Sequence, residues 1–289
     1  MNKKKLLLLV TLVALLLLVS GCTIPMDEAN HVITINSEST FMGTMDTEGF
    51  FSAIFVYPLA QAINKITPYT NVGVAILLVT VAINAVVLVL TFKQNVAMQK
   101  LQALQPEMDR IQRKYEGRTD ENSKMRMATE IQNLYKKNNI NPLGSMVVMF
   151  IQLPILLAVF QAIQRADAVI NGTFMGVSLE STILKGLGNG QYVYGLLFVL
   201  MLATQIGTAL LPQYLNNRHA KQEAEKHMRS YHPVKNSSTQ TTTMYIMTAI
   251  ISIFALSWPA AMSFYWMISN LVNIVKSIIV DEMIQKKKN

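Results

Sequence analysis

The single cysteine of the chain, Cys22, is the residue whose surroundings most directly predict covalent chemistry. It ends the run Val19-Ser20-Gly21-Cys22, directly after an apolar stretch that begins at Leu6 and is preceded by three lysines. Basic, apolar and small residues in this order are typical of a secretory signal peptide, and a cysteine directly after the cleavage site is typical of a bacterial lipoprotein. We therefore expect residues 1–21 to be removed. Cys22 would then carry covalent diacylglycerol, with or without an N-acyl chain, and acyl chains such as palmitate would anchor the new N-terminus on the outer side of the membrane. The alternative is an uncleaved N-terminal anchor in which the cysteine is incidental.

The other reactive side chains form no catalytic constellation. The four histidines lie outside the long apolar segments, and the sequence has no HExxH, GxSxG or Walker motif. Cysteine and histidine also lack the spacing of a zinc site. We therefore predict that the chain is not an enzyme and needs neither a metal nor another cofactor.

Uncharged polar residues recur on one face of several apolar segments. One stripe, with spacings of three and four residues, consists of Ser263, Trp266, Asn270, Asn273 and Ser277. Other segments contribute Thr80, Asn84, Thr91, Gln152, Thr204, Gln205 and Thr208. An amide in hydrocarbon costs free energy unless it finds a partner or water. Two explanations for these polar faces stay open. The side chains form interhelical hydrogen bonds worth about 1 kcal/mol each, or they line a polar cavity shared by four helices.

The elements that carry these residues are long apolar segments. Hydrophobic residues make up 51% of the chain and charged residues 15%, against roughly 25% charged in a soluble domain. About 20 apolar residues are enough to cross some 30 Å of hydrocarbon. We predict an all-α polytopic membrane protein with five transmembrane helices, and their approximate bounds are 72–92, 142–163, 192–211, 242–257 and 260–279.

The distribution of charge predicts the topology independently of the lipid anchor. With the N-terminus outside, five crossings place the C-terminus in the cytoplasm. Eighteen lysines and arginines then fall in inner segments, whereas only Lys65, Arg165 and Lys185 fall in outer ones. This bias agrees with the positive-inside rule. The predicted spans contain no Asp or Glu, which argues against a proton-coupled transporter.

The remaining segments are assigned from their composition. We expect residues 22–47 to be an extracellular tether and residues 48–280 to be the five-span core, followed by a short basic tail over 281–289. The core begins with a helix over 48–67 in the outer interface, because one helical face of this segment gathers apolar residues while Ser52 and Gln61 lie on other faces. That apolar face consists of Phe51, Ile54, Phe55, Leu59, Ala62, Ile63 and Ile66.

Two cytosolic segments interrupt the core, over 93–139 and 212–240. In the first, an apolar seam on two charged sequences predicts a helical hairpin that turns at Gly117 and whose first helix is kinked by Pro106. The seam consists of Ala97, Leu101, Leu104, Met108, Ile111, Tyr115, Met127, Ile131 and Leu134. A solvated connector whose charges only enforce topology is the alternative.

Several short motifs follow one another along the core. They are the stretch from Thr80 to Lys93, Leu104-Gln105-Pro106-Glu107, Asn141-Pro142-Leu143-Gly144, Gln152-Leu153-Pro154-Ile155, Trp258-Pro259-Ala260, Phe264-Tyr265-Trp266 and Asn270-Leu271. In this order and on this topology, over about residues 48–280, the chain resembles the YidC/Oxa/Alb-type membrane protein insertases, in the lipoprotein form found in Gram-positive bacteria.

The resemblance implies an insertase and chaperone of the cell membrane, with five helices around a hydrophilic groove. A nascent hydrophobic segment would enter this groove from the cytoplasm and leave sideways into lipid, either alone or with the Sec translocon. Nascent membrane proteins, ribosomes, the Sec translocon and membrane lipids are the implied partners, and no small-molecule substrate is expected. The groove residues that we assign are Thr80, Asn84, Gln152, Thr204, Gln205, Trp266, Asn270 and Asn273.

The chain departs from the family pattern at two places. The family usually has an arginine in the groove wall of the first span, where Asn84 stands here, and the C-terminal tail is short. A small-solute channel or carrier with the same polar faces is the runner-up function, and a lipoprotein scaffold with purely structural polar stripes is a third.

Overall fold

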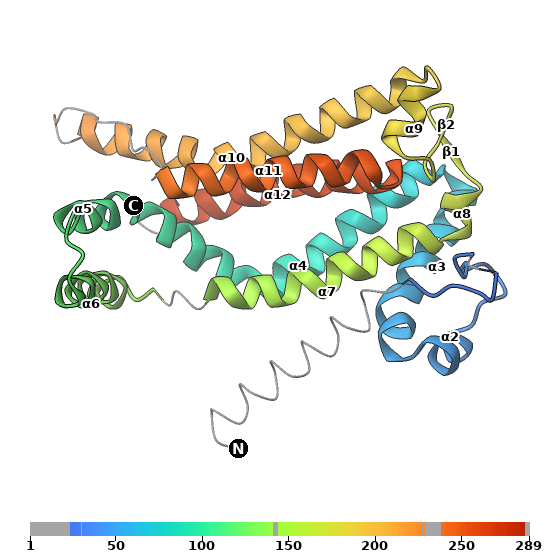
Figure 1. The fold of residues 1–289 in the computed structure, drawn as a ribbon, viewed down its shortest axis with the longest axis horizontal. Coiled ribbons are helices and arrows are strands. Elements are labelled where there is room, and N and C mark those ends of the chain that lie inside the picture. The colour runs from blue at the N-terminus through green and yellow to red at the C-terminus, as the bar shows by residue number, and fades with distance from the viewer. Residues whose placement is uncertain (1–23, 30, 141–143, 227, 229–237, 287–289) are drawn as a thin grey trace. The chain divides into compact units, whose positions relative to one another are not determined.

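The structure is a computed structural model that describes residues 24–29, 31–140, 144–226, 228 and 238–286. The lipoprotein signal and Cys22 lie outside these residues. The chain divides into two compact units, and its helices and strands are labelled in Figure 1. The first unit consists of residues 1–87, 149–203 and 252–269, and the second consists of residues 88–148, 204–251 and 270–289.

Five long helices correspond to the five predicted spans. They are α4 (Val72–Ala103), α7 (Gly144–Arg165), α10 (Tyr192–Lys226), α11 (Ser238–Ser257) and α12 (Ala260–Lys286). Among the described residues, α10, α12 and residues 72–101 of α4 are long and apolar enough to cross a membrane, and α7 and α11 contain shorter apolar stretches. The predicted all-α polytopic membrane fold is therefore confirmed.

The helices extend beyond the apolar segments that predicted them. Helix α4 continues past Phe92 to Ala103, because no glycine or proline interrupts this polar extension. Helix α10 continues to Lys226, so that residues 212–226 of the expected cytosolic loop are helical. Likewise, α12 includes residues 281–286 of the expected basic tail.

The N-terminal part of the first unit is folded, although its polar composition predicted a tether. It contains helix α2 (Phe41–Glu48), which begins where the Thr40 side chain accepts a hydrogen bond from the Gly43 N–H. A π-helical turn over Ser52–Val56 leads into α3 (Tyr57–Ile66), and a 3₁₀ turn (Thr67–Tyr69) follows.

The π-turn changes which residues of the predicted interfacial helix are buried. A π-turn holds one residue more than an α-helical turn, and it therefore rotates the faces that precede it relative to those that follow. Ser52 and Gln61, expected on other faces, are buried together with Phe51 and Ile63, whereas Ile54 is 38% exposed. The predicted separation into an apolar face and polar faces is thus not observed for Ser52, Gln61 and Ile54, whereas Phe51 and Ile63 of the apolar face are buried.

The connection between α7 and α10 forms a small cap within the first unit. It contains α8 (Asp167–Ile170), an antiparallel hairpin of β1 (Thr173–Phe174) and β2 (Val177–Ser178), and α9 (Ile183–Gly188). The Ala260 N–H donates to the Ser181 carbonyl (2.8 Å) and the Ala261 N–H donates to the Leu179 carbonyl (2.9 Å). The first turn of α12 is therefore fixed to this connection.

In the second unit, α5 (Gln105–Lys114) and α6 (Glu121–Lys137) pack against each other as the predicted hairpin. Gly117 has a φ of +79°, as expected for the turn. Pro106 lies in the first turn of α5, so the helix breaks at Leu104 instead of kinking.

The hairpin is tied by side chains as well as by its apolar seam. The Lys114 ammonium and the Tyr115 hydroxyl both donate to Glu130 Oε1, at 2.6 and 2.7 Å. These bonds lower the pKa of Glu130, with the Lys114 bond as the larger cause, and the same bond raises the pKa of Lys114. The Tyr135 hydroxyl reaches Met108 Sδ at 3.4 Å. Two helices held by these contacts form more than a solvated connector.

Candidate functional site

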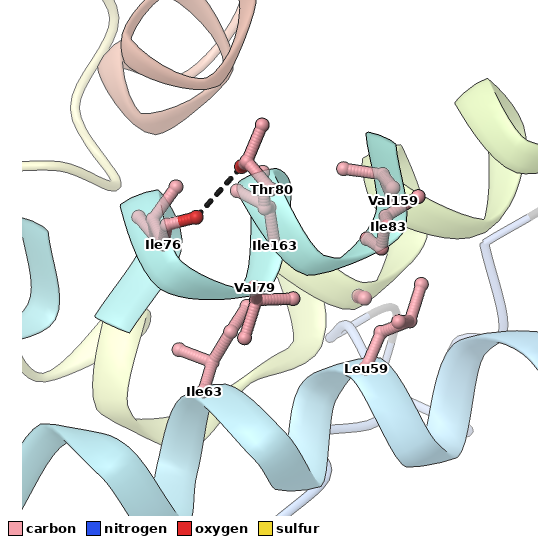
Figure 2. A pocket seen from close by; sticks show the side chains of 9 residues that line it. Leu59, Ile63, Ile76, Val79, Thr80, Ile83, Val159 and Ile163 are labelled. Carbon is pink, nitrogen blue, oxygen red and sulfur yellow. Dashed lines mark hydrogen bonds between the residues drawn. The ribbon is translucent and has the colours of Figure 1, made fainter. Parts of the chain in front are cut away.

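Thr80, one of the predicted groove residues, lies in an apolar environment of the first unit. It is 2% exposed and lines a small pocket among side chains of α3, α4 and α7 (Figure 2). The pocket has a volume of about 10 Å³, which is close to the minimum for one water molecule. The Thr80 hydroxyl donates to the Ile76 carbonyl at 2.6 Å. This geometry satisfies the hydroxyl within its own helix.

Asn84, which stands where the family usually has an arginine, lies one turn further along α4. Its side-chain Nδ2 donates to the Thr80 carbonyl at 2.9 Å, and the residue is half-buried. The amide is therefore oriented by its own helix and contributes a dipole without a net charge.

The second unit brings two predicted groove residues into direct contact. Asn270 of α12 is 6% exposed, and its Nδ2 donates to Gln205 Oε1 of α10 at 3.0 Å. Thr208 Oγ1 donates to the Thr204 carbonyl at 2.9 Å and approaches the Asn270 carbonyl at 3.4 Å. These polar contacts join α10 and α12 within the second unit.

A further group of amides continues along the second half of α4. Asn95 Nδ2 donates to the carbonyl and the hydroxyl of Thr91, at 2.9 and 2.8 Å. Gln99 Nε2 donates to the Ser277 carbonyl of α12 at 3.0 Å. The side-chain oxygens of Gln94 and Gln99 are buried, and no hydrogen bond to either is found. A buried carbonyl oxygen without a donor favours the approach of a water or of a polar group of a ligand.

Of this second group, only Thr91 was expected among the polar residues of the first span, and Gln94, Asn95 and Gln99 were not predicted as site residues. Thr91, Asn95 and Gln99 recur every four residues, and this spacing was visible in the sequence. The amides of the group were missed because the first span was expected to end at Phe92, so they counted as part of the cytosolic hairpin.

The other predicted groove residues are distributed over both units. Gln152 of α7 is exposed and Trp266 of α12 is half-buried, both in the first unit. Asn273 of α12 is half-buried in the second unit. Of the eight predicted residues, a side-chain contact joins Gln205 and Asn270, while Thr80 and Asn84 are neighbours on one helix.

Outside the hairpin, two of the ion pairs among the described residues join side chains that are far apart in sequence. His219 of α10 lies 2.8 Å from Asp281 of α12 in the second unit, and Arg165 binds Glu48 in the first. In the part of the chain that the structure describes, no three His, Cys, Asp or Glu side chains gather as a metal site would require. The buried oxygens of Gln94 and Gln99 can accept hydrogen bonds from polar groups of a ligand.

The chain is similar to known membrane proteins over most of its length. Residues 62–288 match the family model described as the 60Kd inner membrane protein. The chain is 27% identical to the membrane protein insertase YidC of Oceanobacillus iheyensis over 99% of this chain and 100% of that protein. It is 30% identical to the membrane protein insertase YidC 2 of Bacillus anthracis over 96% and 94%. It is 27% identical to the membrane protein insertase MisCA of Bacillus subtilis over 96% and 92%.

Proposed function

Because the chain belongs to the 60Kd inner membrane protein family, we propose that it inserts nascent membrane proteins into the cell membrane. The relatives named above are membrane protein insertases, and the match to each covers more than nine tenths of both chains. The clients are then hydrophobic segments that arrive from the cytoplasm, and the work is binding and partitioning without a covalent step.

The observation that carries the mechanism is the pair of buried side-chain oxygens on Gln94 and Gln99 in the second unit. A client segment has a short polar flank whose transfer into hydrocarbon costs several kcal/mol for each unsatisfied group. Backbone N–H groups of such a flank would donate to these oxygens. This exchange of partners lowers the cost of bringing the flank into the membrane.

The half-buried Asn84 supports insertion without a fixed positive charge at this position of the first long helix. An amide orients a polar flank by hydrogen bonds, whereas an arginine would also attract acidic residues over a longer distance. The hydrophobic segment then moves sideways into lipid, driven by its transfer free energy and by the membrane potential. Such a cycle requires no nucleotide.

The proposal includes the topology and the partners expected from the sequence. Cys22 carries the lipid anchor on the outer side, and the C-terminus lies in the cytoplasm. The α5–α6 hairpin then faces the ribosome, and the Sec translocon shares clients that have larger outer domains. Basic residues of the inner segments attract ribosomal RNA in a salt-dependent manner.

Insertion into liposomes tests the proposal directly. The purified protein is reconstituted, and a single-span client is scored by protection of its translocated flank from protease. We expect the double variant Gln94→Met and Gln99→Met to lower the initial rate about tenfold, because two lost hydrogen bonds of about 0.7 kcal/mol each correspond to that factor.

Thr80→Val is the matched control, because the Thr80 hydroxyl is satisfied within its own helix. It should insert the client at the wild-type rate. Equal rates for the wild type and the double variant would refute the proposed role of the two glutamines. Absence of insertion by every folded variant, together with solute flux through the vesicles, would instead favour a channel or carrier.

A further inference from the structure

The backbone around Ile35 runs beside the end of α7 in the first unit. The Ile35 N–H donates to the Arg165 carbonyl at 2.6 Å, and the Asp167 N–H donates to the Ile35 carbonyl at 3.2 Å. Ile35 and Ala166 form a parallel bridge, and both are almost fully buried. A segment that follows the N-terminus is thus built into the packing of a helix far away in sequence.

A buried ion pair joins the same two regions. Arg165 is fully buried and Glu48, at the end of α2, is 7% exposed. The guanidinium Nη1 and Nη2 reach the two carboxylate oxygens of Glu48 at 2.7 and 2.5 Å, and Nε donates to the Ile33 carbonyl at 2.7 Å. All three nitrogens of the guanidinium are therefore engaged by the N-terminal segment, and none faces a ligand.

Side chains of helix α3 also form hydrogen bonds with the backbone around Ile35. Gln61 Nε2 donates to the Asn36 carbonyl and Asn64 Nδ2 donates to the Ile35 carbonyl, each at 2.6 Å. Asn64 Oδ1 also accepts a hydrogen bond from the Ala168 N–H at 3.0 Å. One side chain of α3 thus bonds both to the segment and to the backbone of α8.

We infer that residues 33–48 form a strap, locked by the Arg165–Glu48 pair, that fastens the N-terminal region to α3 and to the end of α7. The lock is strong because bidentate carboxylate–guanidinium pairs are specific in geometry and because removal of one partner leaves the other charge buried and unpaired. The strap consequently opens as one cooperative unit. This inference is independent of the proposed function.

Hydrogen exchange of the full-length protein in lipid nanodiscs tests the strap. In the wild type, peptides that cover residues 33–36 and 166–169 should both be protected. In Glu48→Gln we expect exchange in both peptides to accelerate together by about 100-fold or more, because breaking a buried pair strongly destabilises the structure around it. Peptides of the α5–α6 hairpin should keep their wild-type rates.

Asp46→Asn is the matched control, because Asp46 is an exposed acid on the same helix. It should leave both peptides unchanged. The inference is overturned if residues 33–36 exchange like an unfolded chain in the wild type, a measurement that requires no variant. It is equally overturned if Glu48→Gln exchanges at the wild-type rate or if Asp46→Asn matches Glu48→Gln.

Discussion

The substitution Gly186→Ala should destabilise the first unit through a single methyl group. Gly186 is buried in α9, and a Cβ built on it would lie 2.0 Å from Cδ2 of Tyr194. Since ordinary contact begins near 3.4 Å, the ring must move by about 1.4 Å. Tyr194 is 1% exposed and its hydroxyl donates to the Ser178 carbonyl at 2.7 Å, so this movement would break the hydrogen bond.

The expected loss combines two effects. Forcing an extra methyl group into a packed site costs about 1–3 kcal/mol, and the broken hydrogen bond adds about 1 kcal/mol. We therefore expect Gly186→Ala to lower the free energy of unfolding by about 2–4 kcal/mol. Reversible unfolding in mixed detergent micelles, followed by circular dichroism, measures this difference.

Gly188→Ala is the control on the same helix, since no atom lies within 4 Å of its added Cβ. It should change the free energy of unfolding by less than about 1 kcal/mol, with stabilisation as the expected direction. Tyr194→Phe alone should cost about 1 kcal/mol, which isolates the hydrogen bond. If Gly186→Ala were as stable as Gly188→Ala, the contact between α9 and the Tyr194 ring would not be as tight as described.

The remaining predictions concern the hairpin and the polar helices. The hairpin should lose stability as the pH falls below 4.5, the ordinary pKa of Glu130, because the pKa of Glu130 is lowered in the fold. Circular dichroism against pH checks this, and Glu130→Gln should be less sensitive than the wild type, with the remaining loss due to the lowered pKa of Asp120. The raised pKa of Lys114 predicts a second loss as the pH rises above 10.5, which the same titration with Lys114→Met tests. A double-mutant cycle of Gln205→Met and Asn270→Leu should give a coupling of about 0.6–1.7 kcal/mol, and additive effects would contradict their hydrogen bond. Asn84→Asp should sharply slow client insertion into liposomes, because it places a carboxylate where an amide now stands; a wild-type rate would exclude Asn84 from the client path.

The long helices were predictable because an apolar run of sufficient length has one stable form in hydrocarbon. Their ends were less predictable. The amides that follow Phe92 looked like the start of a solvated hairpin, yet the helix continues until Leu104, because the first strong helix breaker is Pro106. Composition locates the membrane-crossing part of a helix, whereas backbone hydrogen bonding decides where it ends.

Interactions between distant parts of the chain could not be predicted from the sequence. Arg165 was counted as an outer charge, but it is fully buried because Glu48, distant in sequence, neutralises it. The strap looked like a tether because its sequence is polar. In the fold its backbone groups bond to the backbone around Ala166 and to the side chains of Arg165, Gln61 and Asn64. Thr80 lies on the same helical face as Asn84 and was therefore predicted to line the groove. A hydroxyl can also be satisfied by its own helix, however, and the Thr80 hydroxyl donates to the Ile76 carbonyl.

The π-turn over Ser52–Val56 has a consequence for comparing chains of this family. A turn that holds one extra residue can lose it and become an ordinary α-helical turn, without any change in the helices on either side beyond a rotation. Relatives that differ by one residue before Tyr57 should therefore carry the insertion or deletion within 52–56. An alignment gap placed elsewhere in this region would pair buried residues such as Ala53 and Val56 with exposed ones.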